Sequence, residues 1–157
     1  YRISVSIDGK LDAPVAFGDE YQVDTPFMRD TSAGLLTCYA YKADKDATDY
    51  DVQCKVGTGK LFDLEQVKFK DQLFPQACVM NNQIVTAWLD YDNMVKARVF
   101  DTDGTPKGDQ GTIYTSKPVA EYSLFCDDSG FDVIARLMDN SVSAYRYTYD
   151  DNGFKIV

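Results

Sequence analysis

The sequence predicts an all-β protein built from about three and a half four-stranded antiparallel units. Three observations predict this fold. Glycine turns recur at a nearly constant spacing, 22 of the 25 acidic residues are Asp, and the apolar segments are short and rich in β-branched and aromatic residues. Asp favours turns whereas Glu favours helix interiors, so this composition is typical of a chain with many turns and few helices. A length of 157 residues suits a single domain.

The turns recur with a period of about 48 residues. The turn glycines are Gly9, Gly59, Gly104 and Gly153, which lie 50, 45 and 49 residues apart. A basic residue followed by a β-branched or aromatic one precedes each turn, and these basic residues are Arg2, Lys55, Arg98 and Arg146. We expect each glycine to adopt the positive φ that a hairpin turn requires. The period suits a unit of strand, turn, strand, loop, strand, glycine turn and strand.

The repeat divides the chain into units that together form one all-β repeat domain, residues 1–157. The first halves of two units align well, since 74–90 and 121–139 both have the pattern of strand, polar turn and strand. Residues 25–42 are a weaker copy. Residues 61–66 are helix-like in composition, but the repeat register favours a strand there. The predicted units are a partial unit at 1–19 and complete or nearly complete units at 20–69, 70–115 and 116–157.

One segment resembles a known repeat unit. Residues 84–113, IVTAWLDYDNMVKARVFDTDGTPKGDQGTI, combine an apolar-Ala-Trp strand, a loop, a strand with Arg98, an Asp-x-Asp-Gly turn and a Gly-rich return. This pattern resembles units that occur in tandem in large secreted bacterial proteins, including RTX-type exoproteins, and those units are similar to β-propeller blades. The resemblance is best over 74–115, fair over 119–155 and weak over 20–69. It implies a β-propeller-like arrangement and says nothing about a ligand.

The number of units is too small to close a propeller, because closed propellers have about 4–8 blades. A single blade cannot bury both of its faces, so the end of the array needs a cover. We therefore expect an excerpt of a longer chain with neighbouring repeats, or a homo-oligomer or polymer. In the second case the partial unit at 1–19 completes a sheet by strand addition. A β-trefoil-like barrel is the alternative architecture, since its usual length matches this chain.

Charge and composition exclude several classes of partner. The formal charge is −9, from 16 basic and 25 acidic residues, and the basic residues are scattered. Nucleic acid and anionic membrane surfaces are therefore not expected partners. No apolar run approaches the ~20 residues that span a bilayer. The chain contains no His and lacks phosphate-loop and dinucleotide motifs, so we expect no catalytic residues and no enzymatic activity.

The four cysteines indicate a compartment. Cys38 and Cys54 flank the acidic loop 42–50, and a symmetric hairpin places them directly opposite each other. Cys78 and Cys126 lie on corresponding first strands of adjacent units. We predict two disulfides, Cys38–Cys54 and Cys78–Cys126, and hence an oxidising compartment, either extracellular or at the surface of a cell or particle. Four buried free thiols in a cytosolic protein are the alternative.

Clustered Asp residues are the candidate metal ligands, and no other cofactor is expected. Ca²⁺ takes about six to eight oxygen ligands, and two turns carry several carboxylates. The Asp-x-Asp-Gly turn is only a fragment of a calcium-loop motif, because no Glu follows at the required offset. Asp also serves turns by accepting backbone N–H groups, and we favour this role here. The calcium candidates are Asp44, Asp46, Asp49, Asp101 and Asp103.

Two functions are compatible with these features. The first is a non-enzymatic extracellular structural or adhesive module that assembles through β-sheet edges, for example as a filament or surface-assembly subunit. The alternative is a carbohydrate-binding, lectin-like module, assisted by Ca²⁺ in the Asp loops, because exposed aromatic rings stack on sugars. Tyr145, Tyr147 and Tyr149 share one strand face, and we expect them to pack against the neighbouring unit. The sequence does not identify the ligand.

Overall fold

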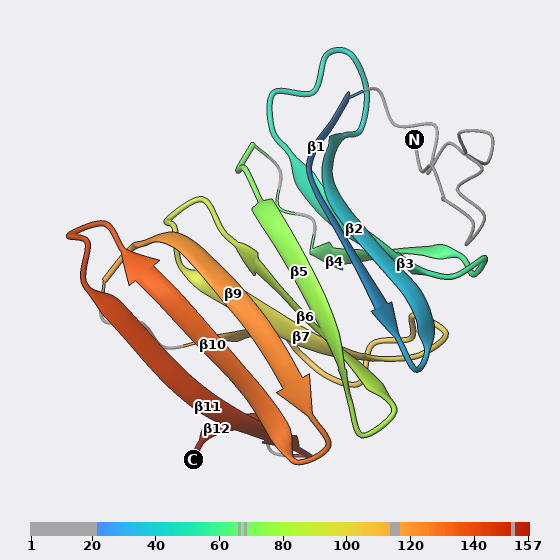
Figure 1. Ribbon diagram of the computed structural model, residues 1–157. Helices are drawn as coiled ribbons and strands as arrows, with labels where there is room; N and C mark the ends of the chain where they lie inside the picture. The colour runs from blue at the N-terminus through green and yellow to red at the C-terminus, as the bar shows by residue number, and fades with distance from the viewer. Residues whose placement is uncertain (1–21, 66, 68, 114–116, 152) are drawn as a thin grey trace, which may run out of the picture.

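The computed structural model describes residues 22–65, 67, 69–113, 117–151 and 153–157. In these residues it contains twelve strands and no helix (Figure 1). The strands form three four-stranded antiparallel sheets, and within each sheet they follow one another in chain order. The predicted all-β class and the predicted four-stranded units are therefore confirmed. The partial unit at 1–19, with Arg2 and Gly9, lies outside the described residues.

Each sheet lies within the bounds of one predicted unit. The first sheet consists of β1 (Gln22–Thr31), β2 (Gly34–Lys42), β3 (Asp51–Val56) and β4 (Leu61–Glu65). The second consists of β5 (Leu73–Met80), β6 (Gln83–Leu89), β7 (Val95–Asp101) and β8 (Gly111–Thr112). The third consists of β9 (Val119–Asp127), β10 (Gly130–Leu137), β11 (Val142–Asp150) and β12 (Gly153–Ile156). The helix-like segment is the strand β4, and the strands of the described residues do not close into a barrel.

The three sheets are stacked in series, with the second sheet in the middle (Figure 1). Their first strands, β1, β5 and β9, lie side by side. Successive residues of a strand point to opposite faces of the sheet. In β6, Trp88 packs against the first sheet, whereas Ala87 and Leu89 pack against the third. The second sheet therefore buries both of its faces, which explains the nearly continuous apolar run in β6.

Equivalent positions in the three sheets point the same way along the stack. We call the face that contains the third residue of β2, β6 or β10 the forward face of its sheet. In the first two sheets this face packs against the next sheet. The cross-strand pairs at this position are Leu36 and Val56 in the first sheet, Val85 and Val99 in the second, and Asp132 and Arg146 in the third. The third sheet thus carries charged residues where the other two carry apolar ones.

Two hydrophobic clusters hold the stack together. The cluster between the first and second sheets contains the single Trp of the chain, Trp88, which is completely buried. The cluster between the second and third sheets contains Phe131 and Tyr147, whose rings stack with centroids 5.3 Å apart. Tyr145 and Tyr149 pack partly against the same cluster. The expected packing of these tyrosines against the neighbouring unit is confirmed.

The turn glycines have two different structural roles. Gly104 and Gly153 adopt positive φ, as predicted. The prediction is wrong for Gly59, because the residue with positive φ in that turn is Gly57. Gly59 is required for a different reason, since a Cβ atom there would lie 2.9 Å from the carbonyl oxygen of Val56. A close backbone approach, and not the sign of φ, favours glycine at this repeat position.

Candidate interaction face on the third sheet

The forward face of the third sheet is exposed and carries an apolar band. Ile134 on β10 and Val142 on β11 are 44% and 68% exposed, and Ala144 is the cross-strand partner of Ile134. The band contributes to a shallow hollow of about 330 Å³, whose wall also includes Ser123 and Arg136. The equivalent faces of the first two sheets are covered by the next sheet. The band therefore lies where the other sheets make an inter-sheet contact.

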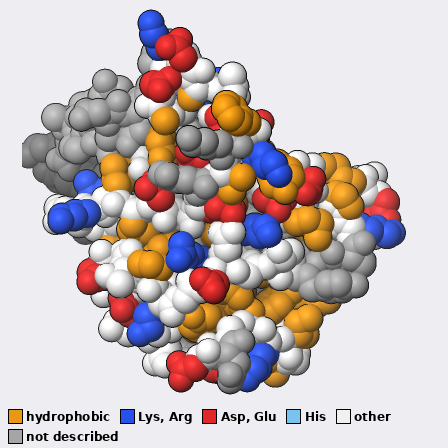
Figure 2. Space-filling view, turned by 180° about the vertical axis from the view of Figure 1, so that it is seen from behind, with side chains coloured by type: hydrophobic (Ala, Val, Ile, Leu, Met, Phe, Trp, Pro, Cys, Tyr) orange, Lys and Arg blue, Asp and Glu red, His pale blue; other side chains and the backbone are white. Residues whose placement is uncertain are grey.

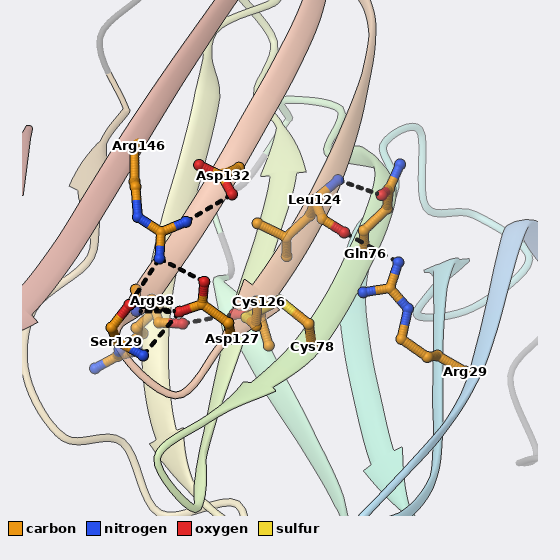
Figure 3. The surroundings of a disulfide bond; sticks show 12 residues. Arg29, Gln76, Cys78, Arg98, Leu124, Cys126, Asp127, Ser129, Asp132 and Arg146 are labelled. Carbon is orange, nitrogen blue, oxygen red and sulfur yellow. Dashed lines mark hydrogen bonds and ion pairs between the residues drawn. A yellow bond between two sulfur atoms is a disulfide. The ribbon is translucent and has the colours of Figure 1, made fainter. Parts of the chain in front are cut away.

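One border of the band is formed by Arg146 and its hydrogen-bond partners at the β9–β10 hairpin. Nη1 of Arg146 donates to Asp132 Oδ2 at 2.8 Å, and Nη2 donates to Asp127 Oδ2 at 2.5 Å and to Ser129 Oγ at 2.8 Å (Figure 3). These bonds to Arg146 hold the pKa of the Asp127 carboxyl well below its ordinary value. Charge-assisted bonds from both terminal nitrogens to separate acceptors fix the orientation of the guanidinium. The hairpin end of the face is therefore charged and ordered.

A second ion pair borders the band at the opposite end. Nε of Arg136 donates to Glu121 Oε1 at 2.7 Å, and Nη1 donates to Asn140 Oδ1 at 3.1 Å. The bond to Arg136 lowers the pKa of Glu121. Lys155 on β12 pairs with Asp150. Each of these cations has a carboxylate partner, and Arg146 has two, so three cations offset four carboxylates on this face.

Both predicted disulfides are present in the structure. Cys38 and Cys54 are cross-strand partners on β2 and β3, with Cα atoms 4.1 Å apart. Cys78 on β5 and Cys126 on β9 join the second sheet to the third, with Cα atoms 5.7 Å apart (Figure 3). The first disulfide therefore closes a hairpin, and the second fixes one sheet to the next. The described residues include no free cysteine.

The calcium candidates in loop 42–50 do not converge on a common site. The carboxylate of Asp44 accepts the backbone N–H groups of Asp46 and Ala47, at 2.8 and 2.9 Å. The carboxylate of Asp49 accepts the backbone N–H of Lys70 at 3.3 Å. Asp46 is exposed. Asp44 therefore has the turn-capping role that the sequence favoured, whereas Asp49 connects the loop to Lys70.

The calcium candidates in the Asp-x-Asp-Gly turn are likewise engaged elsewhere. Asp103 accepts the backbone N–H of Thr105 at 2.9 Å, and this bond lowers the pKa of Asp103. Asp101 pairs with Lys107 at 3.5 Å. Among the residues that the structure describes, no group of three or more His, Cys, Asp or Glu side chains could hold a metal ion. The described carboxylates therefore do not fit the oxygen cage that Ca²⁺ needs.

The carboxyl group of Asp51 on β3 lies in an electrostatically unfavourable environment, and the sequence did not single it out. Burial, together with the negative charges of Asp49, Asp63 and Glu65, raises its pKa from 3.8 to about 6. Its Oδ1 atom is buried and has no hydrogen-bond partner among the described residues. The backbone of Val67 bonds to the carboxylate, but an ionised carboxylate with one buried oxygen left unpaired still costs folding free energy. Asp51 therefore destabilises the first sheet at neutral pH.

We expect the stability of the protein to rise as the pH falls from neutral toward 5. The folded-state pKa of Asp51 lies above the ordinary value of 3.8, so the proton binds the folded state more tightly, and the gain is complete only below that value. Solvent screening limits the gain to about 1 kcal/mol. D51N should show a higher Tm at neutral pH and a flatter pH profile. The exposed-loop variant D46N is the control, and a D51N profile as steep as wild type contradicts the assignment.

The face residues were not among the candidate sites predicted from the sequence. The sequence repeat aligns Arg146 with Lys55 and Arg98, whereas the strand pairing places Asp132 and Arg146 where the second sheet has Val85 and Val99. The available signal was therefore the change from apolar to charged residues at these positions. That signal becomes visible only when the strand pairing assigns each position to a face. A charged pair in a strand is otherwise typical of any half-exposed sheet.

In the described part of the chain, no helix has the length and apolar character needed to cross a bilayer. Basic, acidic and hydrophobic side chains are interleaved on the back of the molecule (Figure 2).

No family model, curated protein or solved structure matches the chain, so the resemblance to tandem blade units remains a prediction.

Proposed function

We propose that the protein is a non-enzymatic extracellular structural or adhesive module that associates with a second copy of itself through the forward face of the third sheet. The observation that carries this proposal is the exposed band of Ile134, Ala144 and Val142 at the place where the first two sheets are covered. The two disulfides support an oxidising, extracellular location. The contact would cover this face as the next sheet covers the faces of the first two.

A second copy is the occupant that the charges favour. The chain carries −9, so copies repel each other over most of their surface. On the candidate face, Arg136, Arg146 and Lys155 offset all but one of the four carboxylates that they pair with, so the repulsion between copies is weaker there. Two-fold pairing brings the same apolar band together from both copies, as closed homodimers require. The face thus combines apolar surface with charges that two identical copies can tolerate.

The proposal uses a sheet face because the edges formed by β4, β8 and β12 are poorly suited to strand addition, and the opposite edges, β1, β5 and β9, lie side by side in the stack. The outermost strands β4, β8 and β12 contain 5, 2 and 4 residues. Short edge strands limit the hydrogen bonds that another chain can add. Serial stacking of three sheets supports an open, β-propeller-like array in preference to a β-trefoil-like barrel.

A single charge on the band tests the proposal. Wild type is expected to show a mass that rises with concentration in sedimentation equilibrium, and I134E is expected to weaken association by more than about tenfold, because it buries a carboxylate in the contact. M28E, at a similarly exposed site on β1, adds the same charge elsewhere and should behave as wild type. A wild-type mass that stays monomeric at every concentration, or I134E that associates normally, would reject the face.

A further inference from the structure

A second feature lies where the first strands of the three sheets meet. Arg29 on β1 reaches across β5 to β9, where its Nη2 donates to the carbonyl oxygen of Leu124 at 3.0 Å (Figure 3). Its side chain forms part of the wall of an open hollow of about 260 Å³, together with Ser32, Phe125 and the Cys78–Cys126 disulfide. This hollow shares no wall residue with the hollow beside the apolar band, although Phe125 lies on the same face of the third sheet as Ile134.

The guanidinium of Arg29 has unused hydrogen-bonding capacity. A guanidinium carries five N–H donors, and only the bond to Leu124 is made by Arg29 within the described residues. Its carbon Cζ lies 5.2 Å from the ring centroid of Phe27 and 5.9 Å from that of Phe125. No described carboxylate lies within ion-pair distance, in contrast to Arg146. Burial lowers the pKa of Arg29, as expected for a cation without a counter-charge.

The neighbouring backbone limits what can enter the hollow. The side chain of Gln76 donates to the carbonyl oxygen of Tyr122 at 2.7 Å and accepts the N–H of Leu124 at 3.0 Å (Figure 3). These bonds occupy the free edge of β9, so an extended peptide cannot pair with that edge as an added strand. A ligand that needs no backbone pairing is therefore favoured.

We propose that this hollow binds an acidic sugar, such as a uronate at the end of a glycan, with its carboxylate on Arg29 and its ring against Phe125. Arginine recognises carboxylates with two parallel N–H bonds. The ring of Phe125 is 49% exposed and offers an apolar surface to the C–H groups of a sugar ring. The hydroxyl of Ser32 is exposed beside it. The volume is below the range of about 300–1,000 Å³ for drug-sized ligands, which suits a single sugar ring.

The negative charge of Asp30 is expected to lower the affinity of the hollow for an acidic sugar. It also lies in the wall of the hollow, although alternation along β1 turns its side chain away from Arg29. Its negative charge opposes an anionic ligand over this short distance. Removing that charge is therefore expected to tighten binding, whereas removing the charge of Arg29 is expected to weaken it. Substitutions of these two adjacent residues are thus expected to change the binding affinity in opposite directions.

The test is an NMR titration with glucuronate, with glucose and a short acetylated peptide bearing a free carboxylate as comparison ligands. Millimolar glucuronate is expected to shift the Arg29 Nε–H and Phe125 ring signals, and glucose is not. R29Q should lose at least about tenfold in affinity, equivalent to one charge-assisted hydrogen bond. D30N should bind more tightly, and R98Q, which loses an arginine that lies in neither proposed site, should bind as wild type.

Several outcomes would overturn the proposal. Absence of shifts with glucuronate would reject the site, equal shifts with glucose would reject the role of the carboxylate, and stronger binding of the peptide would reject the sugar. Unchanged emission from buried Trp88 confirms that R29Q is folded. The inference does not rest on self-association, and the two can be separated. R29Q should still associate, and I134E should still bind glucuronate.

Discussion

Replacement of Cys78 and Cys126 together by Ala is expected to lower the free energy of unfolding by about 4 kcal/mol, the entropy of closing a long loop in the unfolded chain. The two residues are separated by 48 positions, compared with 16 for Cys38 and Cys54. The shorter loop corresponds to about 3 kcal/mol in the same treatment. The larger effect therefore belongs to the disulfide that joins two sheets. Urea denaturation followed by far-UV circular dichroism measures it.

Partial reduction of the wild type provides the control for this double variant. Cys126 is partly exposed, whereas Cys38 and Cys54 are completely buried. A mild reductant should therefore open Cys78–Cys126 first, and the partly reduced wild type should unfold at the same urea concentration as the variant. A loss below about 1 kcal/mol, or free thiols in the unreduced denatured chain, contradicts the expectation.

W88A is expected to lower the free energy of unfolding by about 4 kcal/mol, near the middle of the range for large buried aromatics. Trp88 is completely buried between the first and second sheets. Its Nε1–H also donates to Glu65 Oε2 at 3.1 Å, which connects β6 to β4. Truncation therefore leaves a cavity and removes a link between the two sheets. Denaturation is followed by circular dichroism, because the variant lacks the single Trp of the chain.

W88F separates the two contributions at this position. Phe preserves most of the apolar contact but cannot donate to Glu65, so its loss should be about 1 kcal/mol plus a smaller packing cost. E65Q keeps an oxygen that accepts the indole N–H and should be close to wild type. If W88A costs no more than W88F, then Trp88 does not fill the space between the sheets as described.

The sheets and the disulfide partners could be predicted because they depend on local register. The turn spacing located three four-stranded units, and the symmetry of the β2–β3 hairpin paired Cys38 with Cys54. Cys78 and Cys126 were paired because they lie on corresponding strands. The structure adds that they occupy inequivalent positions, since Cys78 is paired with Val85 and Cys126 with Phe131. Their side chains consequently face each other across the gap between the sheets.

Other features depend on the packing of distant segments, which the sequence alone did not provide. Arg29 contacts Leu124 across 95 residues, and no turn spacing predicts that β1 reaches β9. The raised pKa of Asp51 arises from burial and from acidic neighbours in loop 42–50 and on β4, which composition does not reveal. Gly59 was misassigned because a close backbone approach and a positive φ both favour glycine. The sequence indicated that glycine is required at this position, but not the structural reason for the requirement.

The covalent link between β5 and β9 also determines how the molecule would respond to tension along its chain. A disulfide bypasses the segment that it closes, so the 48-position stretch from Cys78 to Cys126 cannot lengthen while the bond is intact. At about 3.4 Å per extended residue, this conceals roughly 160 Å of contour length. A pulled molecule would release that length only after reduction. The molecule would therefore extend under tension in two stages, one mechanical and one chemical.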